Sequence, residues 1–383
     1  MRPAVTLLTA IVLGTALAAC SGSEEKITYI EPPDVPSSLR AFRPNVHSLL
    51  VSNTGARDFT EEASLWVRGG SVFFDLGLWI GARVGGVVRV SATSYFGSEF
   101  RPLVLPGGTR ALVYILRKGE GAGDEDYDTW PVTSGAPSDE AGAPRVTGDA
   151  TAWTAYQDND PTRHTIFDTP PLGAEVRQTV WGTAAVDSVL YQRFDVKNAS
   201  ADAWSDAYLG IWVDPDLGFA ANDLVGCDVP LSMGYVYTAA SPLETAWGAY
   251  QPACGIVLLE TPQDAGFFAF PRVWKGDTEP ENAAEAYNLL QGLNVNGEAF
   301  LDSTSGEPTR FTASGDPVAG TGSIEHVAAD RRMMLVTGPL TFSPGDSATL
   351  VYAIVFARAA ERLAAVTALR QAAGTLERGA GAR

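Results

Sequence analysis

Short hydrophobic runs separated by turn-forming residues make up most of the chain. Between Val46 and Phe356 these runs are rich in β-branched and aromatic residues, and Gly, Pro, Asn and Asp stand between them. Such runs are typical of β-strands joined by turns. The sequence lacks the long alternation of strands and helices that a parallel α/β sheet requires. The pattern therefore predicts an all-β fold, an antiparallel β-sandwich. The clearest runs are HSLLVSN, SVFFDLGLWIGA, GVVRVSATSYF, RALVYILRK, VLYQRFDVKN, AYLGIWVD, CGIVLLE, RMMLVTG and ATLVYAIVFA.

Two turns and two helices follow from local signals. Val-Gly-Gly-Val at residues 84–87 predicts a tight hairpin, since glycine supplies the positive φ angles of such turns. Ser-Pro-Gly-Asp at 343–346 predicts a turn before the last strand. Residues 279–292 have a proline near their start and a glycine just past their end, which predicts a short internal helix. The stretch 359–376 is rich in Ala, Leu, Glu and Arg and predicts a C-terminal helix.

The strand AYLGIWVD carries apolar side chains on both faces. Tyr208 and Trp212 share one face, while Leu209, Ile211 and Val213 share the other. A strand of this kind is expected to be covered on both faces, as in stacked sheets.

Composition divides the chain into four parts. The β-sandwich body, residues 42–357, is either one body or two packed halves. Segment 119–150, rich in Gly, Pro, Asp and Ala, is either a linker between those halves or a long loop on one body. The parts are a signal peptide (1–19), a flexible tether (20–41), a β-sandwich body (42–357, with possible halves 42–185 and 186–357) and a C-terminal helical tail (358–383).

The amino-terminal residues resemble a bacterial lipoprotein signal. Arg2 precedes an apolar run that ends in small residues, the layout of a secretory signal. Leu17-Ala18-Ala19-Cys20 resembles the lipobox, in which the cysteine sulfur receives a lipid before cleavage. The resemblance implies that Cys20 carries fatty acyl chains such as palmitate, and that Ser21 directs the product to the outer membrane. The alternative is an ordinary secretory signal whose cysteine is incidental.

The other two cysteines form an even pair. If Cys20 is lipidated, Cys227 and Cys254 remain, and an exported protein lies in an oxidising compartment. The parity predicts a disulfide between them; two buried free thiols are the alternative. The three histidines lie far apart in sequence, and no Cys/His cluster has the spacing of a structural zinc site.

The net charge of −18 sets limits on partners. An acidic surface repels nucleic acid and anionic lipid headgroups, so DNA and RNA are excluded as expected partners. The hydrophobic content of 45% is ample for a folded core.

One loop has the composition of a calcium site. DPDLGFAANDLVGCD places Asp214, Asp216, Asp223 and Asp228 within a short stretch that begins where a strand ends. Calcium binds carboxylate and carbonyl oxygens, and a loop with alternating aspartates can direct several of them inward. The spacing departs from that of the EF-hand. The alternative is that these aspartates only begin turns by accepting backbone N–H groups.

Three further polar stretches stand out in the sequence. Asp158, Asn159 and Asp160, followed by Arg163 and His164, predict a surface turn with an Asp–Arg contact, or an Asp–His acid–base pair. Residues 330–332 (Asp-Arg-Arg) predict ion pairs at a sheet edge; the alternative is an arginine that binds a ligand. The acidic run 124–128 predicts a solvated loop. No G-x-S-x-G, P-loop or H-E-x-x-H motif occurs.

Several motifs together resemble a group of exported bacterial β-sandwich proteins that have no assigned activity. The resemblance implies the fold and an extracytoplasmic compartment. The motifs are GLWIG (77–81), GGVVRVS (85–91), SEF (98–100), DNDPTRH (158–164), PLGAEV (171–176), DPDLGFAANDLVGCD (214–228), EAYNLLQGL (285–293), GDPVAGTG (315–322) and ADRR (329–332).

These features predict a cell-envelope lipoprotein with a non-enzymatic binding or scaffolding role, stabilised by calcium. Its expected partners are the membrane, through the N-terminal lipid, and a glycan or envelope protein on the periplasmic or surface face. The alternative function is a carbohydrate-active enzyme that uses paired carboxylates, as glycoside hydrolases do.

Overall fold

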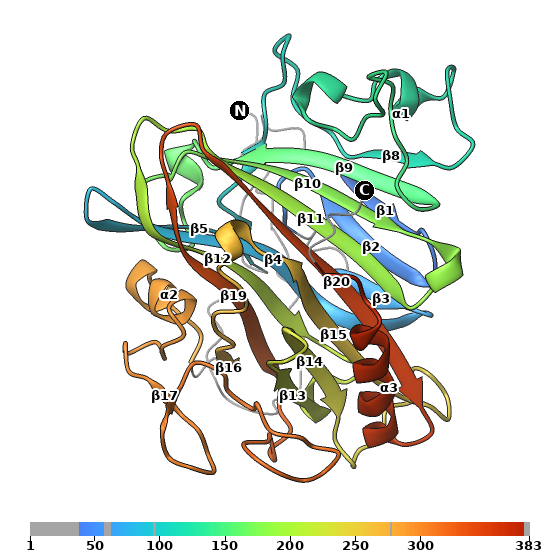
Figure 1. Ribbon diagram of the computed structural model, residues 1–383, viewed down its shortest axis with the longest axis vertical. Helices are drawn as coiled ribbons and strands as arrows, with labels where there is room; N and C mark the ends of the chain where they lie inside the picture. The colour runs from blue at the N-terminus through green and yellow to red at the C-terminus, as the bar shows by residue number, and fades with distance from the viewer. Residues whose placement is uncertain (1–37, 57–62, 95–96, 276–277, 379–383) are drawn as a thin grey trace, which may run out of the picture. The chain divides into compact units, whose positions relative to one another are not determined.

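Antiparallel sheets form most of the fold, as the sequence predicts (Figure 1). The computed structural model describes residues 38–56, 63–94, 97–275 and 278–378, which belong to the compact unit Pro32–Arg383. The signal, Cys20 and most of the tether lie outside the described residues.

The larger sheet has nine strands, seven of them in the order β1-β2-β3-β4-β12-β19-β16, with β5 paired to β4 and β6 to β5. The strands are β1 (Leu39–Phe42), β2 (His47–Ser52), β3 (Leu65–Val67), β4 (Gly70–Val84), β5 (Val87–Ser94), β6 (Gly97–Ser98), β12 (Trp204–Pro215), β16 (Arg272–Trp274) and β19 (Arg331–Phe342).

The second sheet has six strands in the order β10-β11-β20-β15-β14-β13. Two smaller sheets have the orders β7-β9-β8 and β17-β18. The strands are β10 (Ala174–Gly182), β11 (Val189–Asn198), β13 (Asp223–Asp228), β14 (Met233–Thr238), β15 (Gln251–Glu260) and β20 (Ser347–Ala359), then β7 (Arg101–Pro102), β8 (Tyr114–Arg117), β9 (Ala150–Gln157), β17 (Phe300–Leu301) and β18 (Pro308–Thr309).

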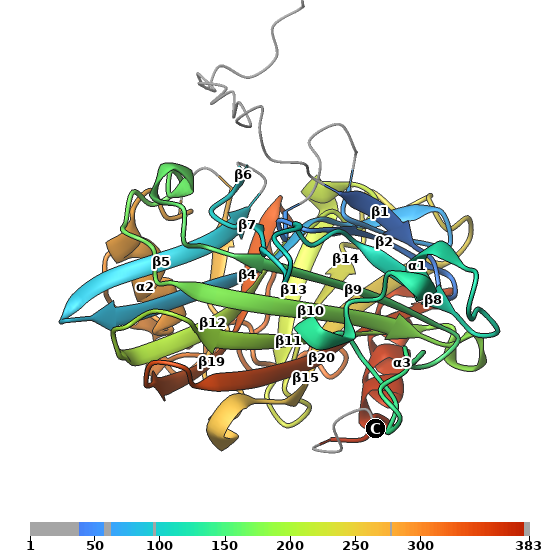
Figure 2. The same ribbon diagram turned by 90° about the horizontal axis from the view of Figure 1, so that it is seen from above.

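The main core lies between the two large sheets, and each sheet is covered on its other face by a helix (Figures 1 and 2). Helix α2 (Ala283–Leu290) covers the larger sheet and α3 (Arg362–Gly374) covers the smaller one. In β12, Leu209 therefore joins the central core, while Trp212 lies under α2 and stacks on Trp79. This explains why both faces of that strand are apolar.

The local predictions agree with the structure. Val84 pairs with Val87 across the predicted hairpin, and Gly85 and Gly86 have φ angles of +59° and +85°. The side chain of Asn282 accepts the backbone N–H groups that open α2, so this helix begins after Pro280.

Segment 119–150 is a loop on the body and contains the short helix α1 (Glu125–Asp128). Trp130 anchors this loop, because its ring is buried beside Tyr114 and its Nε1 donates to the carbonyl of Pro137. Both large sheets take strands from each side of residue 185, so the possible halves 42–185 and 186–357 are interleaved.

The expected disulfide between Cys227 and Cys254 is not formed, and both thiols are buried and free. The two cysteines lie on β13 and β15, and β14 runs between these strands. Strands two positions apart in a sheet are separated by about 10 Å, whereas the Cα atoms of a disulfide lie within about 7 Å. Burial raises the pKa of both thiols. The alternative of two buried thiols is what the structure has.

Candidate functional site

A cluster of aspartates lies where β12 ends and β19 begins. The carboxyl groups of Asp214, Asp216 and Asp330 each offer an oxygen, and these oxygens lie within 4.8 Å of one another. The register of the sheet explains why these aspartates are neighbours. Val213 of β12 pairs with Met333 of β19, so the residues that follow Val213 lie beside those that precede Met333. Two segments far apart in sequence thus build one acidic site.

Two further aspartates adjoin this group. Asp75 of β4 pairs directly with Asp214 across the sheet, and like charges in that position repel one another. Asp223, at the start of β13, is fully buried and its Oδ2 accepts the backbone N–H of Leu217 at 3.2 Å. Its Oδ1 has no hydrogen-bond partner among the described residues.

Arg332 is shared by three carboxylates at the cluster. Its Nη1 lies 2.6 Å from Oδ1 of Asp214 and also contacts Asp330, while its Nε lies 2.9 Å from Oε1 of Glu279. Lys275 forms a second ion pair with Asp330, at 3.2 Å. A single guanidinium shared in this way compensates only part of the negative charge around it.

The crowding of carboxylates raises the pKa of the buried aspartates in the cluster. Burial raises the pKa of Asp214 well above its usual range, and Asp216, Asp75 and Asp330 add to the increase against the opposing effect of Arg332. Burial likewise raises the pKa of Asp223, with further increases from the neighbouring aspartates. Either a proton or a cation relieves such repulsion. The cluster therefore has the ligand chemistry of a site for a hard divalent cation.

The structure brings together two of the four predicted ligands, Asp214 and Asp216. Asp223 is not in the converging group, although the charges of Asp216, Asp214 and Asp330 raise its pKa. Asp228 lies at the other end of β13, where it forms an ion pair with Arg370 at 3.0 Å. Asp330 was expected only to form ion pairs at a sheet edge. The strand register that makes it a partner of Asp214 cannot be seen in a local motif.

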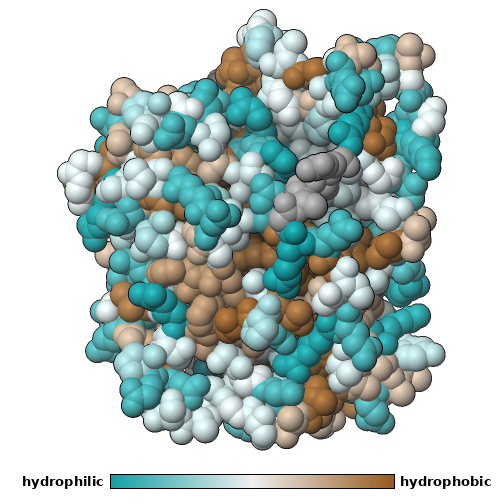
Figure 3. Space-filling view, in the orientation of Figure 1, coloured by the Kyte–Doolittle hydropathy of each residue, from teal (hydrophilic) through white to brown (hydrophobic). Residues whose placement is uncertain are grey.

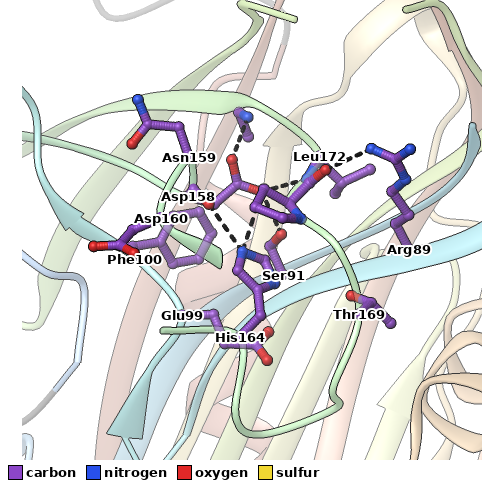
Figure 4. A network of polar contacts seen from close by, with 12 residues as sticks. Arg89, Ser91, Glu99, Phe100, Asp158, Asn159, Asp160, His164, Thr169 and Leu172 are labelled. Carbon is purple, nitrogen blue, oxygen red and sulfur yellow. Dashed lines mark hydrogen bonds and ion pairs between the residues drawn. The ribbon is translucent and has the colours of Figure 1, made fainter. Parts of the chain in front are cut away.

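The second polar stretch forms a buried network (Figure 4). Asp158 is fully buried and accepts hydrogen bonds from the Ser91 hydroxyl at 2.5 Å and from the N–H groups of Leu172 and Ala174. Nε2 of His164 lies 2.9 Å from the Asp158 carbonyl oxygen. The prediction of a surface turn is therefore wrong for Asp158, because these hydrogen bonds hold its side chain in the interior. Its neighbour Asp160 forms an ion pair at 3.2 Å, with Arg101 from outside this stretch.

Glu99 also holds residues 158–172 in place, through hydrogen bonds to a different part of this segment. Its carboxyl group is fully buried and accepts the backbone N–H groups of Ala92, Ile166 and Phe167. Burial raises the pKa of Glu99 to about 8, although the three N–H groups favour the carboxylate. Glu99 and Asp158 together fasten residues 158–172 to β5, and Ser91 donates to Asp158 rather than to His164. The geometry is that of a structural anchor and not of a nucleophile activated by histidine.

A separate hollow of about 990 Å³ lies beside β8. Its four carboxylates all come from one short segment of its wall: Glu120, Asp124, Glu125 and Asp126.

Comparisons with known proteins do not assign a family. No protein-family model matches the sequence, and no curated protein sequence matches it. Among solved structures, the chain is similar to a bacterial glucoamylase complexed with acarbose, with a TM-score of 0.40, 5% identity and coverage of 89% of this chain and 34% of that chain. It is also similar to a putative aldose 1-epimerase from Escherichia coli K12, with a TM-score of 0.28, 11% identity and coverage of 84% and 99%.

The chain thus spans about a third of the glucoamylase. Likenesses this distant carry no argument about activity, and the family resemblance carried by the motifs stays a prediction. None of the helices in the described part of the chain is long and apolar enough to cross a membrane.

Proposed function

We propose that this protein is an exported, lipid-anchored β-sandwich of the bacterial cell envelope that binds or scaffolds a partner and is stabilised by calcium. The observation that carries the calcium proposal is the convergence of Asp214, Asp216 and Asp330 within 4.8 Å. The lipid anchor is supported by the lipobox-like residues that end at Cys20.

The ligand chemistry favours calcium over transition metals. The converging side chains are all carboxylates, which suit hard cations, whereas zinc and copper sites use histidine or cysteine. The charges of Asp216, Asp214 and Asp330 raise the pKa of buried Asp223, and its Oδ1 has no hydrogen-bond partner among the described residues. A bound Ca²⁺ would share Asp214 and Asp330 with Arg332 and would reduce the repulsion between Asp75 and Asp214.

The burial of the site favours a clamp over a catalyst. Of the three converging carboxylates, Asp214 is 1% exposed and Asp216 and Asp330 are half-buried, so a polymeric substrate cannot contact the group as a whole. An ion held there would join the loop after β12 to the start of β19. We therefore assign the ion a structural role, and assign binding of a glycan or envelope protein to another surface.

Calcium is expected to stabilise the fold measurably. Extracellular sites commonly have Kd values of about 10⁻⁴–10⁻³ M. About 10 mM calcium would then raise the free energy of unfolding by about 1.4–2.7 kcal/mol. Thermal melts of the purified protein in calcium and in chelator measure this difference as a higher melting temperature.

Two matched variants make the calcium test specific. Asp216→Asn is expected to abolish the response, because it removes one converging carboxylate. Asp228→Asn is expected to keep it, because Asp228 pairs with Arg370 away from the cluster. Equal melting temperatures in calcium and chelator, or a full response in Asp216→Asn, would contradict the proposal. Turnover of any member of a polysaccharide panel by the purified protein would contradict the non-enzymatic role.

A further inference from the structure

Lys275 lies beside the aspartate cluster, directly after the strand β16. Strand β16 is antiparallel to β19 and Trp274 pairs with Arg331, so the residues that follow Trp274 lie beside those that precede Arg331 (Figure 1). The N–H of Lys275 donates to the carbonyl oxygen of Asp330 at 3.4 Å, and Nζ of Lys275 lies 3.2 Å from Oδ2 of Asp330. Backbone and side chain thus both hold Lys275 against one of the converging aspartates.

Both carboxylate oxygens of Asp330 contact cationic side chains. Oδ1 contacts Nη1 of Arg332, and Oδ2 forms the ion pair with Lys275. A Ca²⁺ ion that binds Asp330 must therefore share an oxygen with one of these cations or displace it. Because cations gathered around one carboxylate repel one another, displacement of the more weakly held cation is favoured.

The two cations are held to different degrees. The side chain of Arg332 is 3% exposed and forms ion pairs with three carboxylates. The side chain of Lys275 is 51% exposed, so its ammonium can move into water without losing a buried environment. An ion pair at so exposed a position contributes little to stability. Lys275 is therefore the cation that a bound ion would displace.

A divalent ion suits the cluster better than the lysine does. The three converging oxygens lie within 4.8 Å of one another, and one Ca²⁺ ion with ligand distances of about 2.3–2.6 Å can contact oxygens that lie about 4.6–5.2 Å apart. Oδ2 of Asp214 is buried and accepts no hydrogen bond from any described residue. The ammonium of Lys275 pairs with Asp330 and leaves this buried oxygen without a donor.

We propose that Lys275 is a built-in competitor of calcium: its ammonium pairs with Asp330 in the absence of the ion and moves into solvent when calcium binds. This competition weakens the calcium affinity and sets the calcium concentration at which β12 and β19 are clamped together. The inference rests on the calcium site of the proposed function and names the residue that regulates it. The backbone bond to Asp330 keeps the lysine beside the cluster, so the ion pair forms again when calcium leaves.

Urea unfolding of the purified protein tests the competition, at a series of calcium concentrations and constant ionic strength, with chelator as the zero point. Calcium raises the free energy of unfolding by RT ln(1 + [Ca²⁺]/Kd), so one series gives both Kd and the stability without the ion. Lys275→Met keeps an unbranched side chain and removes the ammonium. We expect its Kd to be about threefold to fivefold lower than that of the wild type, the upper range for one partly exposed ion pair.

The two ends of the calcium series distinguish competition from a purely structural role. In chelator, Lys275→Met is expected to be less stable than the wild type, because Asp330 loses a counter-ion. In saturating calcium the two proteins are expected to be equally stable, because the wild-type ammonium has then left Asp330. A lysine that only supports the fold would raise stability equally at both ends, and its removal would leave Kd unchanged.

Two control variants test whether the position of the charge matters. Lys118→Met removes the same charge from another exposed ion pair, that of Lys118 with Asp149, and is expected to keep the wild-type Kd. Lys275→Arg keeps a cation beside Asp330 and is expected to bind calcium no more tightly than the wild type.

The outcomes separate this inference from the calcium proposal. Calcium binding by the wild type with an unchanged Kd in Lys275→Met would overturn the competition and leave the calcium site in place. An equal fall in Kd for Lys118→Met would mean that net charge alone controls the affinity. Absence of calcium binding by the wild type and by Lys275→Met would remove the site and the competition together. Binding by Lys275→Met alone would support the competition.

Discussion

At the scale of the residue, buried ionisable groups dominate the behaviour of this protein. Asp158, Asp214, Asp223 and Glu99 are held inside by backbone N–H groups, strand register or a shared arginine, and burial raises the pKa of each of them. Each such carboxyl group binds a proton in the folded state more tightly than in the unfolded chain. Their shared direction predicts that stability falls as pH rises from mildly acidic to mildly alkaline values.

Glu99 allows this pH dependence to be tested at one position. Its pKa is about 8 in the folded state against a usual 4.5, so its contribution is present below about pH 4.5 and is lost as pH rises through 8. Burial lowers the pKa of His47 to about 4, so His47 makes the protein more stable as pH rises. This gain is complete above about pH 6.5.

Between pH 6.5 and 8, Glu99 therefore lowers the free energy of unfolding by about 2 kcal/mol, and His47 does not offset this loss. Urea unfolding at these two pH values is expected to show the loss in the wild type and a flatter profile in Glu99→Gln. Parallel pH profiles for the two proteins would rule out Glu99 as a source.

At the scale of the element, the two outer helices allow both large sheets to be apolar on both faces. Helix α3 places Ala365, Val366 and Leu369 over Tyr235, Val257 and Ala353 of the smaller sheet. Its sequence has no strong cap: the Glu361 side chain makes no capping hydrogen bond. The helix is therefore stabilised mainly by this packing rather than by its own ends.

Leu369→Ala tests how far the sheet depends on its helix. Leu369 is fully buried, and truncating a leucine in such a site costs about 2–5 kcal/mol. Gln371 is exposed on the same helix, and Gln371→Ala is expected to change the free energy of unfolding by less than about 0.5 kcal/mol. Chemical denaturation of both variants measures the difference. A small effect at Leu369 would mean that the helix does not stabilise the sheet.

At the scale of the whole molecule, hydrophilic residues are spread over the face seen in Figure 3, with smaller hydrophobic areas between them. The net charge of −18 does not favour adsorption to anionic membranes. The proposed lipid would supply attachment through its acyl chains, which contribute about 0.8 kcal/mol per buried methylene.

The lipid anchor is testable in cells. Labelled palmitate is expected to enter the wild-type protein and not Cys20→Ala, and the wild type is expected in the outer-membrane fraction while the variant is released. An unlabelled wild type, or a Cys20→Ala protein that stays in the membrane fraction, would remove the anchor and the compartment with it.

Local patterns in the sequence determined the strands, the glycine hairpin at 84–87 and the two longer helices. Each of these depends on side chains within a few residues of one another, through alternation, positive φ or capping. The tertiary structure alone decided which distant groups meet. It placed Asp330 and Asp75 beside Asp214, separated Cys227 from Cys254 by a strand and drew Asp158 into the interior. Strand order and register control those meetings, and they depend on the packing of the whole sheet rather than on any short stretch of chain.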